Sequence, residues 1–164
     1  MPLHNISKNM IRKFQIDPFL FMGLLGMTEF FKHNRIGKLA DSKTVNGYQP
    51  KLEKPIEWPG FEPLNKEISS IIDKNIKEKW KFSRSWIISY NKGGWQNKHI
   101  HEYSNISGVL VMFGMGEGKL HFDTGEEFSM HTGDLLLFDS NIEHWADPCV
   151  YPKTLLSFDV RTFE

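Results

Sequence analysis

The chain has 164 residues, and its 20 basic and 20 acidic side chains give a formal net charge of zero. A neutral chain offers no overall field for nucleic acid or anionic lipid, so neither partner is expected. Its length suits one domain over residues 1–164 and leaves the oligomeric state open, a homodimer included. With a single cysteine, Cys149, no intramolecular disulfide can form, so we expect a cytoplasmic protein.

Residues 1–62 form an N-terminal accessory segment. Asp17-Pro18 is typical of a helix start, and it predicts a helix over about residues 18–34. The apolar run 19–31 is shorter than the roughly 20 residues of a membrane span, so we expect this helix to be buried. Prolines and Asn46-Gly47 indicate loops over residues 35–62.

Residues 63–81 are expected to form a helix that buttresses a sheet. Apolar side chains recur there at spacings of three and four, and lysine and glutamate occupy the other face. These apolar residues are Leu64, Ile68, Ile71, Ile72, Ile76 and Trp80.

Residues 82–164 change to short strands separated by glycine-containing turns, at spacings of eight to twelve residues. The turns are Gly93-Gly94, 114–118, Thr124-Gly125 and Thr132-Gly133. The predicted strands are 84–91, 99–101, 107–113, 119–123, 127–130, 134–139 and 154–161. Regular short strands without intervening helices predict a mainly β fold, a sandwich or a barrel.

Three of the seven histidines fit a metal site. His99 and His101 form a His-x-His pair, and on a strand residues two apart point to the same face. His144 follows the apolar strand 134–139, and the intervening chain is long enough for four or five strands. A jelly-roll barrel brings its second and seventh strands together over such a length, so His144 is the candidate third ligand.

Two alternatives remain open for the ligand set. Glu102 could replace His101 if the backbone is irregular there. His121-x-Asp123 is a literal His-x-Asp, the usual opening of a two-histidine, one-carboxylate site. It lies only about 20 residues before His144, which is too little chain to place both on facing strands.

Several short motifs follow one another over about residues 80–161. They are Trp86-Ile-Ile-Ser-Tyr90, Gly93-Gly94-x-Gln96-x-x-His99-x-His101, Ser107-Gly108-Val109, Gly133-Asp134-Leu135-Leu136-Leu137-Phe138 followed by His144, and Lys153-Thr154-Leu155-Leu156-Ser157-Phe158-Asp159. In the order and spacing of these motifs, the second half of the chain resembles the small iron(II)- and 2-oxoglutarate-dependent oxygenases of bacteria and tailed phages.

The resemblance implies a double-stranded β-helix, a jelly-roll barrel of the cupin-like superfamily, with N-terminal buttressing helices. It also implies iron(II) held by His99, His101 and His144, where most of the superfamily has a carboxylate as the middle ligand. Three neutral imidazoles would leave the iron more positive than two imidazoles and a carboxylate.

The resemblance further implies 2-oxoglutarate and dioxygen as co-substrates. The family places an arginine for the far carboxylate about ten residues after the last histidine, and here that position is Lys153, with Arg161 as the alternative. Ser157 in the same strand and Tyr90 are further candidates for contact with 2-oxoglutarate. Leu155 replaces an expected serine or threonine.

The expected function is therefore hydroxylation of an unidentified small molecule, amino acid or peptide. Two other functions fit the histidine spacing: a cupin-type isomerase, lyase or 2-oxoglutarate-independent dioxygenase, and a non-catalytic ligand-binding barrel.

Overall fold

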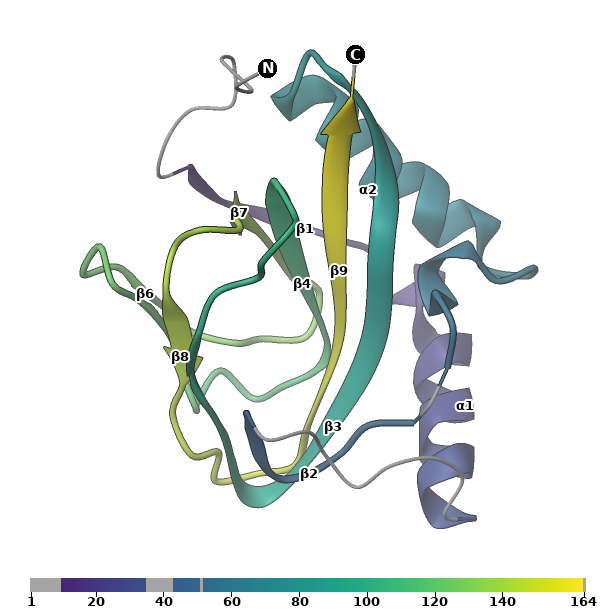
Figure 1. The fold of residues 1–164 in the computed structure, drawn as a ribbon. Helices are drawn as coiled ribbons and strands as arrows, with labels where there is room; N and C mark the ends of the chain where they lie inside the picture. Colours follow the sequence, from purple (N-terminus) through teal and green to yellow (C-terminus); the bar gives the residue numbers. More distant parts are fainter. Residues whose placement is uncertain (1–9, 35–42, 51, 164) are drawn as a thin grey trace.

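A curled antiparallel sheet dominates the computed structural model, which describes residues 10–34, 43–50 and 52–163. The sheet has nine strands, and both α-helices lie on the side of it that faces away from the barrel interior (Figure 1). The predicted mainly β fold with buttressing helices is confirmed.

The N-terminal segment contributes two strands to this sheet. β1 (Ile11–Gln15) pairs with β7 (Asp134–Asp139), and β2 (Thr44–Tyr48) pairs with β3 (Lys79–His99). The sequence did not predict β2 within the loop-rich stretch 35–62, of which residues 35–42 and 51 lie outside the described part.

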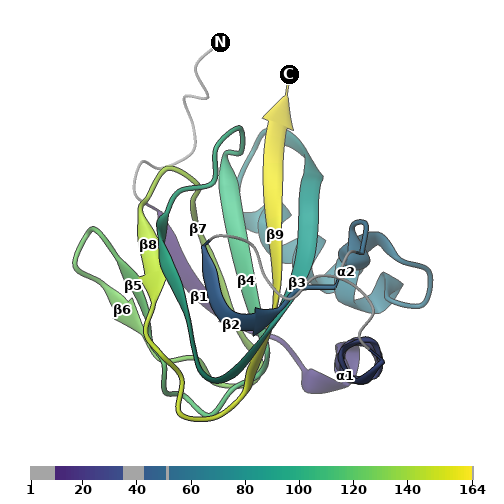
Figure 2. The same ribbon diagram turned by 60° about the horizontal axis from the view of Figure 1, so that its bottom comes forward.

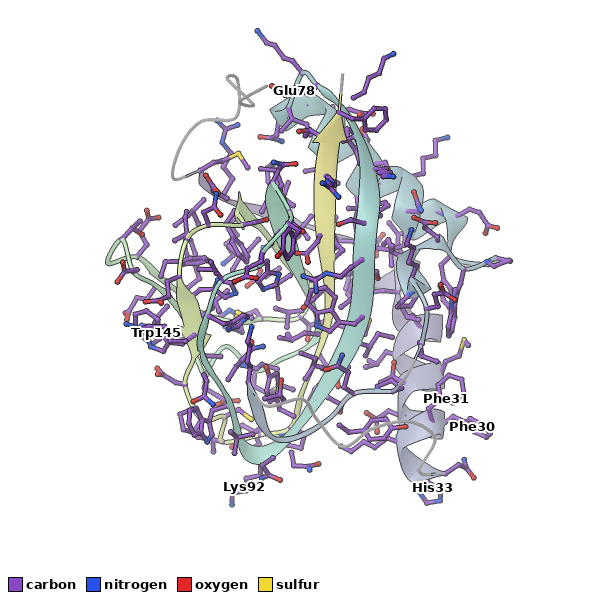
Figure 3. All side chains as sticks on the ribbon, in the orientation of Figure 1. Phe30, Phe31, His33, Glu78, Lys92 and Trp145 are labelled. Carbon is purple, nitrogen blue, oxygen red and sulfur yellow. The ribbon has the colours of Figure 1, made fainter. Side chains whose placement is uncertain are left out.

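The first helical region begins as the sequence predicts. Asp17 accepts a hydrogen bond from the Phe19 amide at 3.0 Å and caps the short 3-10 helix η1 (Pro18–Leu20), which leads into α1 (Met22–His33). The expectation that α1 is buried was wrong, because only Leu24 and Thr28 are buried. Phe30, Phe31 and His33 lie at the end of α1, away from the barrel (Figure 3).

The second helix ends earlier than its apolar pattern suggested. After the 3-10 turn η2 (Pro55–Glu57), α2 spans Glu62–Asn75, so the predicted helix over 63–81 is correct only in its first part. Ile76 is extended, and its side chain stays buried in the core. Trp80 already belongs to β3 and pairs with Thr162. Its position four residues after Ile76 therefore matches helical spacing only by chance.

β3 is a single strand of 21 residues that bends at its glycine pair. The sequence suggested a turn at Gly93-Gly94 between two strands, and this was wrong. Gly93 has φ of +82°, and a Cβ on Gly94 would lie 2.6 Å from the Asn46 carbonyl oxygen. The glycines therefore let β2 approach a bent strand whose pairing continues on both sides.

The remaining strands complete two walls (Figure 2). One wall has the order β1-β7-β4-β9-β3, with β4 at Ile106–Phe113 and β9 at Lys153–Phe163. The other runs β3-β8-β5-β6. Its strands are β8 (His144–Ala146), β5 (Leu120–Phe122) and β6 (Glu127–Phe128). The sequence did not predict β8.

Successive side chains of β9 point alternately into two hydrophobic clusters. Leu156 and Phe158 face the helices and pack in a cluster with Ile68 and Ile72. Leu155 faces the interior and packs in a second cluster between the two walls. None of the helices in the described part is long and apolar enough to cross a membrane.

We predict that Gly94→Ala destabilises the protein by about 1–3 kcal/mol, because the new methyl group must displace backbone. The matched control is Gly26→Ala in α1, where a Cβ meets no atom within 4 Å. It should stabilise the protein by up to about 1 kcal/mol. Urea unfolding measures both, and an unchanged midpoint for Gly94→Ala would show that the close approach is not a constraint.

Candidate metal centre

The three predicted histidines meet where β3 ends. His99 is the last residue of β3 and lies directly opposite His144, the first residue of β8. His101 lies two residues beyond β3, and its amide donates to the Ser140 carbonyl at 3.0 Å. The chain thus leaves regular strand geometry before His101, so the predicted strand over 99–101 was wrong beyond His99.

The side-chain nitrogens of these histidines converge on one point. Nε2 of His101 lies 3.2 Å from Nε2 of His99 and 3.2 Å from Nε2 of His144. Two nitrogens bonded to one ion at about 2.1 Å lie about 3.0 Å apart at a right angle and about 3.4 Å apart at the tetrahedral angle. The observed spacing falls between these limits.

Hydrogen bonds at the opposite ring nitrogens fix the tautomers. Nδ1 of His99 lies 2.7 Å from the Asn97 carbonyl oxygen, and Nδ1 of His144 lies 2.9 Å from that of Ile142. A carbonyl oxygen only accepts, so each Nδ1 must carry the proton. In the neutral rings Nε2 then holds a lone pair, and these lone pairs face one another unless a cation lies between them.

The environment of His144 favours its neutral form. Burial, together with the neighbouring His99 and His101, lowers its pKa to about 3, against the opposing effects of the Ile142 carbonyl and Asp159. A neutral imidazole with a free Nε2 is the form that binds metals. Within the described residues, His99, His101 and His144 are the only group of three or more potential ligands that meets this way.

A buried carboxylate that the sequence reasoning missed supports His101. Asp159 Oδ1 accepts from His101 Nδ1 at 2.7 Å and from the Ser107 hydroxyl at 2.8 Å. Its Oδ2 accepts from Nε and Nη2 of Arg84, at 3.0 and 2.6 Å. Burial acts to raise the pKa of Asp159, but His101, Ser107 and Arg84 outweigh it and the pKa lies below its usual value.

Lys153 and Ser157, two further predicted binding residues, lie on β9. Ser157 lines the same small cavity as the three histidines. Lys153 is almost fully buried, with its Nζ donating to the Gly118 carbonyl at 2.8 Å and lying 5.4 Å from the centre of the Tyr90 ring. Burial lowers the pKa of Lys153, and Cys149, Glu117 and Asp147 partly offset this effect.

The structure does not bring Arg161 or Glu102 into this site. Both side chains are exposed, and Arg161 lies beyond Asp159, on the side of the histidines away from Lys153. Among the described residues, neither belongs to the converging group.

His121 also lies outside the site. Its Nε2 hydrogen-bonds the Asp147 carboxylate, and its ring stacks on Trp145, with the ring centres 5.4 Å apart. Trp145 lies on the outer side of β8 (Figure 3). The His121-x-Asp123 pattern therefore belongs to the outer surface of the barrel.

Two spaces adjoin the histidines. Towards Ser157 lies an interior cavity of about 10 Å³, with Met130 and Leu155 in its lining. The second space is an open groove of about 430 Å³, which His99 and His101 also line. Trp86 and Gln96 line both spaces, so they form part of the boundary between them.

Asp159 carried a signal that the sequence analysis did not use. It continues the alternating row Lys153, Leu155, Ser157 on β9, and inward positions of a strand are normally apolar. A charged side chain at such a position indicates a buried partner. Arg84 lies on β3 and Ser107 on β4, so the alternation along β9 does not indicate that either residue contacts Asp159.

Several solved structures of 2-oxoglutarate-dependent enzymes share this fold. A Pseudomonas putida prolyl-4-hydroxylase matches with a TM-score of 0.72 and 12% identity, over 99% of this chain and 97% of that chain. A viral collagen prolyl hydroxylase from Paramecium Bursaria Chlorella virus-1, in complex with 2-oxoglutarate, matches at 0.70 and 12%, over 93% and 96%. The non-heme α-ketoglutarate-dependent epimerase SnoN matches at 0.73 and 8%, over 94% and 77%.

No protein-family model and no curated protein matches the sequence. The structural likenesses show the fold, and they confirm the predicted double-stranded β-helix.

We predict that the metal-free protein loses stability on acidification through His144. Its pKa is about 3 in the folded chain and about 6.5 when unfolded, so the unfolded chain binds one more proton between these values. The free energy of unfolding therefore falls as the pH is lowered through this range, by up to about 1.4 kcal/mol per pH unit.

Urea unfolding in the presence of a chelator, at pH 6 and pH 5, measures this dependence. For His144→Gln, the free energy of unfolding should fall less steeply between pH 6 and pH 5 than for the unmodified chain. The difference in slope should correspond to nearly one bound proton. Equal slopes would contradict a buried neutral His144.

Proposed function

We propose that this chain is an iron(II)- and 2-oxoglutarate-dependent oxygenase. The observation that carries the proposal is the convergence of three Nε2 atoms at one end of the interior of a double-stranded β-helix. Further along the same wall lies a buried lysine. Similarity to hydroxylases and to an epimerase supports the choice of co-substrate but not the outcome of the reaction.

His99, His101 and His144 would hold the metal through Nε2, each with its Nδ1 hydrogen-bonded so that the ring cannot turn. Imidazole nitrogens suit iron(II), and three protein ligands leave coordination positions open. The bound iron, with 2-oxoglutarate and dioxygen, would supply the oxidation, in which 2-oxoglutarate becomes succinate and carbon dioxide. The surrounding walls orient the reactants and exclude water.

Lys153 would bind the far carboxylate of 2-oxoglutarate. The two groups that its ammonium contacts, the Gly118 carbonyl and the Tyr90 ring, are neutral, and the nearby Glu117 and Asp147 offset its burial only in part. An ammonium has three protons to donate. A buried ammonium is costly without an anion, so a carboxylate there would be stabilised. The cavity of about 10 Å³ holds roughly one water molecule, so Met130 and Leu155 must move to admit the co-substrate.

The open groove would take the substrate. His99 and His101 line it, as they line the interior cavity. It combines the Trp86 ring with charged side chains of both signs, including Glu53 and Lys54, and its 430 Å³ suits a small molecule or a peptide side chain. A cytoplasmic location is part of this proposal.

We predict that His144→Ala weakens iron(II) binding more than about 100-fold, because it removes one of three ligands at a centre with no carboxylate. Anaerobic equilibrium dialysis with metal analysis measures the affinity. His121→Ala is the matched control, since that ring is hydrogen-bonded on the outer surface, and it should bind iron(II) normally. Normal binding by His144→Ala would exclude the three-histidine site.

We predict that Lys153→Met weakens 2-oxoglutarate binding at least tenfold and leaves iron(II) binding unchanged. Methionine matches the lysine side chain as far as Cε but lacks the ammonium. Arg161→Met is the control, because that exposed side chain lies on the other side of the histidines, and it should behave like the unmodified chain.

Anaerobic titration of the iron(II) protein with 2-oxoglutarate follows the metal-to-ligand charge-transfer band in visible light. If no band appears but another metal binds tightly, the cupin alternative is favoured. If no metal binds, a non-catalytic barrel is favoured.

A further inference from the structure

The three histidines differ in what holds their Nδ1 atoms. His99 and His144 each donate to a backbone carbonyl two residues earlier in the chain, at 2.7 and 2.9 Å. His101 instead donates to the side chain of Asp159, 58 residues away on β9, at 2.7 Å. At Nδ1, His101 therefore has a carboxylate partner, whereas His99 and His144 have backbone carbonyl partners.

The position of Asp159 is fixed from three directions. Its side chain is fully buried, and each carboxylate oxygen is occupied: Oδ1 by His101 and Ser107, Oδ2 by Arg84. The Ser107 hydroxyl also lies 2.8 Å from the Ser140 hydroxyl. The backbone carbonyl of Ser140 accepts from the His101 amide at 3.0 Å. The carboxylate and the ring it contacts are thus held by one network of hydrogen bonds.

We propose that Asp159 is a positioning residue that gives the metal, through His101, the negative charge that an all-histidine ligand set lacks. This inference rests on the proposed metal site. In a two-histidine, one-carboxylate site the anion bonds to the metal itself. Here the carboxylate lies one ring further out, where it orients the imidazole and raises the electron-donating strength of Nε2.

A purely structural role for Asp159 makes a different prediction. In that case its contribution is the ion pair with Arg84, whose Nη2 lies 2.6 Å from Oδ2. Replacing either Arg84 or Asp159 should then have the same effect on metal binding. If Asp159 acts on the metal through His101, loss of the carboxylate charge is harmful, whereas loss of the Arg84 charge is not.

The experiment compares Asp159→Asn with Arg84→Met in the full chain. Arg84 is 58% exposed, so its guanidinium can turn to water when the carboxylate is replaced, and Asp159→Asn should fold. The double variant Arg84→Met/Asp159→Asn removes both charges and serves as a second route if the single variant is unstable. Each protein is titrated anaerobically with cobalt(II) alone, and the visible absorption bands of the metal are recorded together with its affinity.

We expect Asp159→Asn and the double variant to bind cobalt(II) about 10–100-fold more weakly, with shifted absorption bands. Arg84→Met should stay within about threefold of the unmodified chain. Equal losses in Arg84→Met and Asp159→Asn would overturn the proposal in favour of a structural role, and unchanged binding by Asp159→Asn would overturn it outright.

Failure of the proposed oxygenase is a separate result. If the unmodified chain binds cobalt(II) and loses affinity in Asp159→Asn, the inference holds even when 2-oxoglutarate fails to bind. If the unmodified chain binds no metal, both proposals are wrong.

Discussion

The site depends on one strand, β3, being shared by both walls of the barrel. Its first part pairs with β9, and its last part pairs with β8 beyond the bend at Gly93-Gly94. This pairing places His99 opposite His144, because the register between β3 and β8 is fixed by backbone hydrogen bonds. A break at the glycines would separate the two walls and remove the alignment of the two rings.

The charges of the site are arranged along β9. Asp159 lies beside His101, and Lys153 lies six residues earlier on the same inward row, with Ser157 and Leu155 between them. Both charged groups are buried, and burial without compensation is unfavourable. Asp159 is compensated within the chain by Arg84, whereas Lys153 contacts neutral groups and is compensated only in part by Glu117 and Asp147. A dianion with one end at the metal and the other at Lys153 would supply the missing compensation.

The sequence predicts the parts of this arrangement that depend on local patterns. Apolar spacing located α2, and strand alternation with turn residues located most of the wall. Spacing also predicted that His99, His101 and His144 would meet, and the structure brings their Nε2 atoms together. Contacts between distant strands are harder to predict. Asp159 and Arg84 meet through the register of β3 on β9, and no local pattern in the sequence encodes that register.

Two errors have the same origin. Gly93-Gly94 is typical of a turn, but here it lets a continuous strand bend while β2 packs against it. The spacing that predicted helix up to residue 80 continued through Ile76 and Trp80, which are extended. In each case tertiary packing selected one of two conformations that the local sequence allows.

The two spaces beside the histidines are built from different parts of the chain. The described residues that line the interior cavity all lie between residues 86 and 157, within the part that resembles the oxygenases. The groove also draws on Lys43, Gln49 and residues 52–54, which precede α2 and lie outside that resemblance. Hydroxylases and an epimerase share this barrel at 8–12% identity, so the fold alone does not determine the substrate. If the groove takes the substrate, as proposed, selectivity would depend in part on Lys43, Gln49 and residues 52–54.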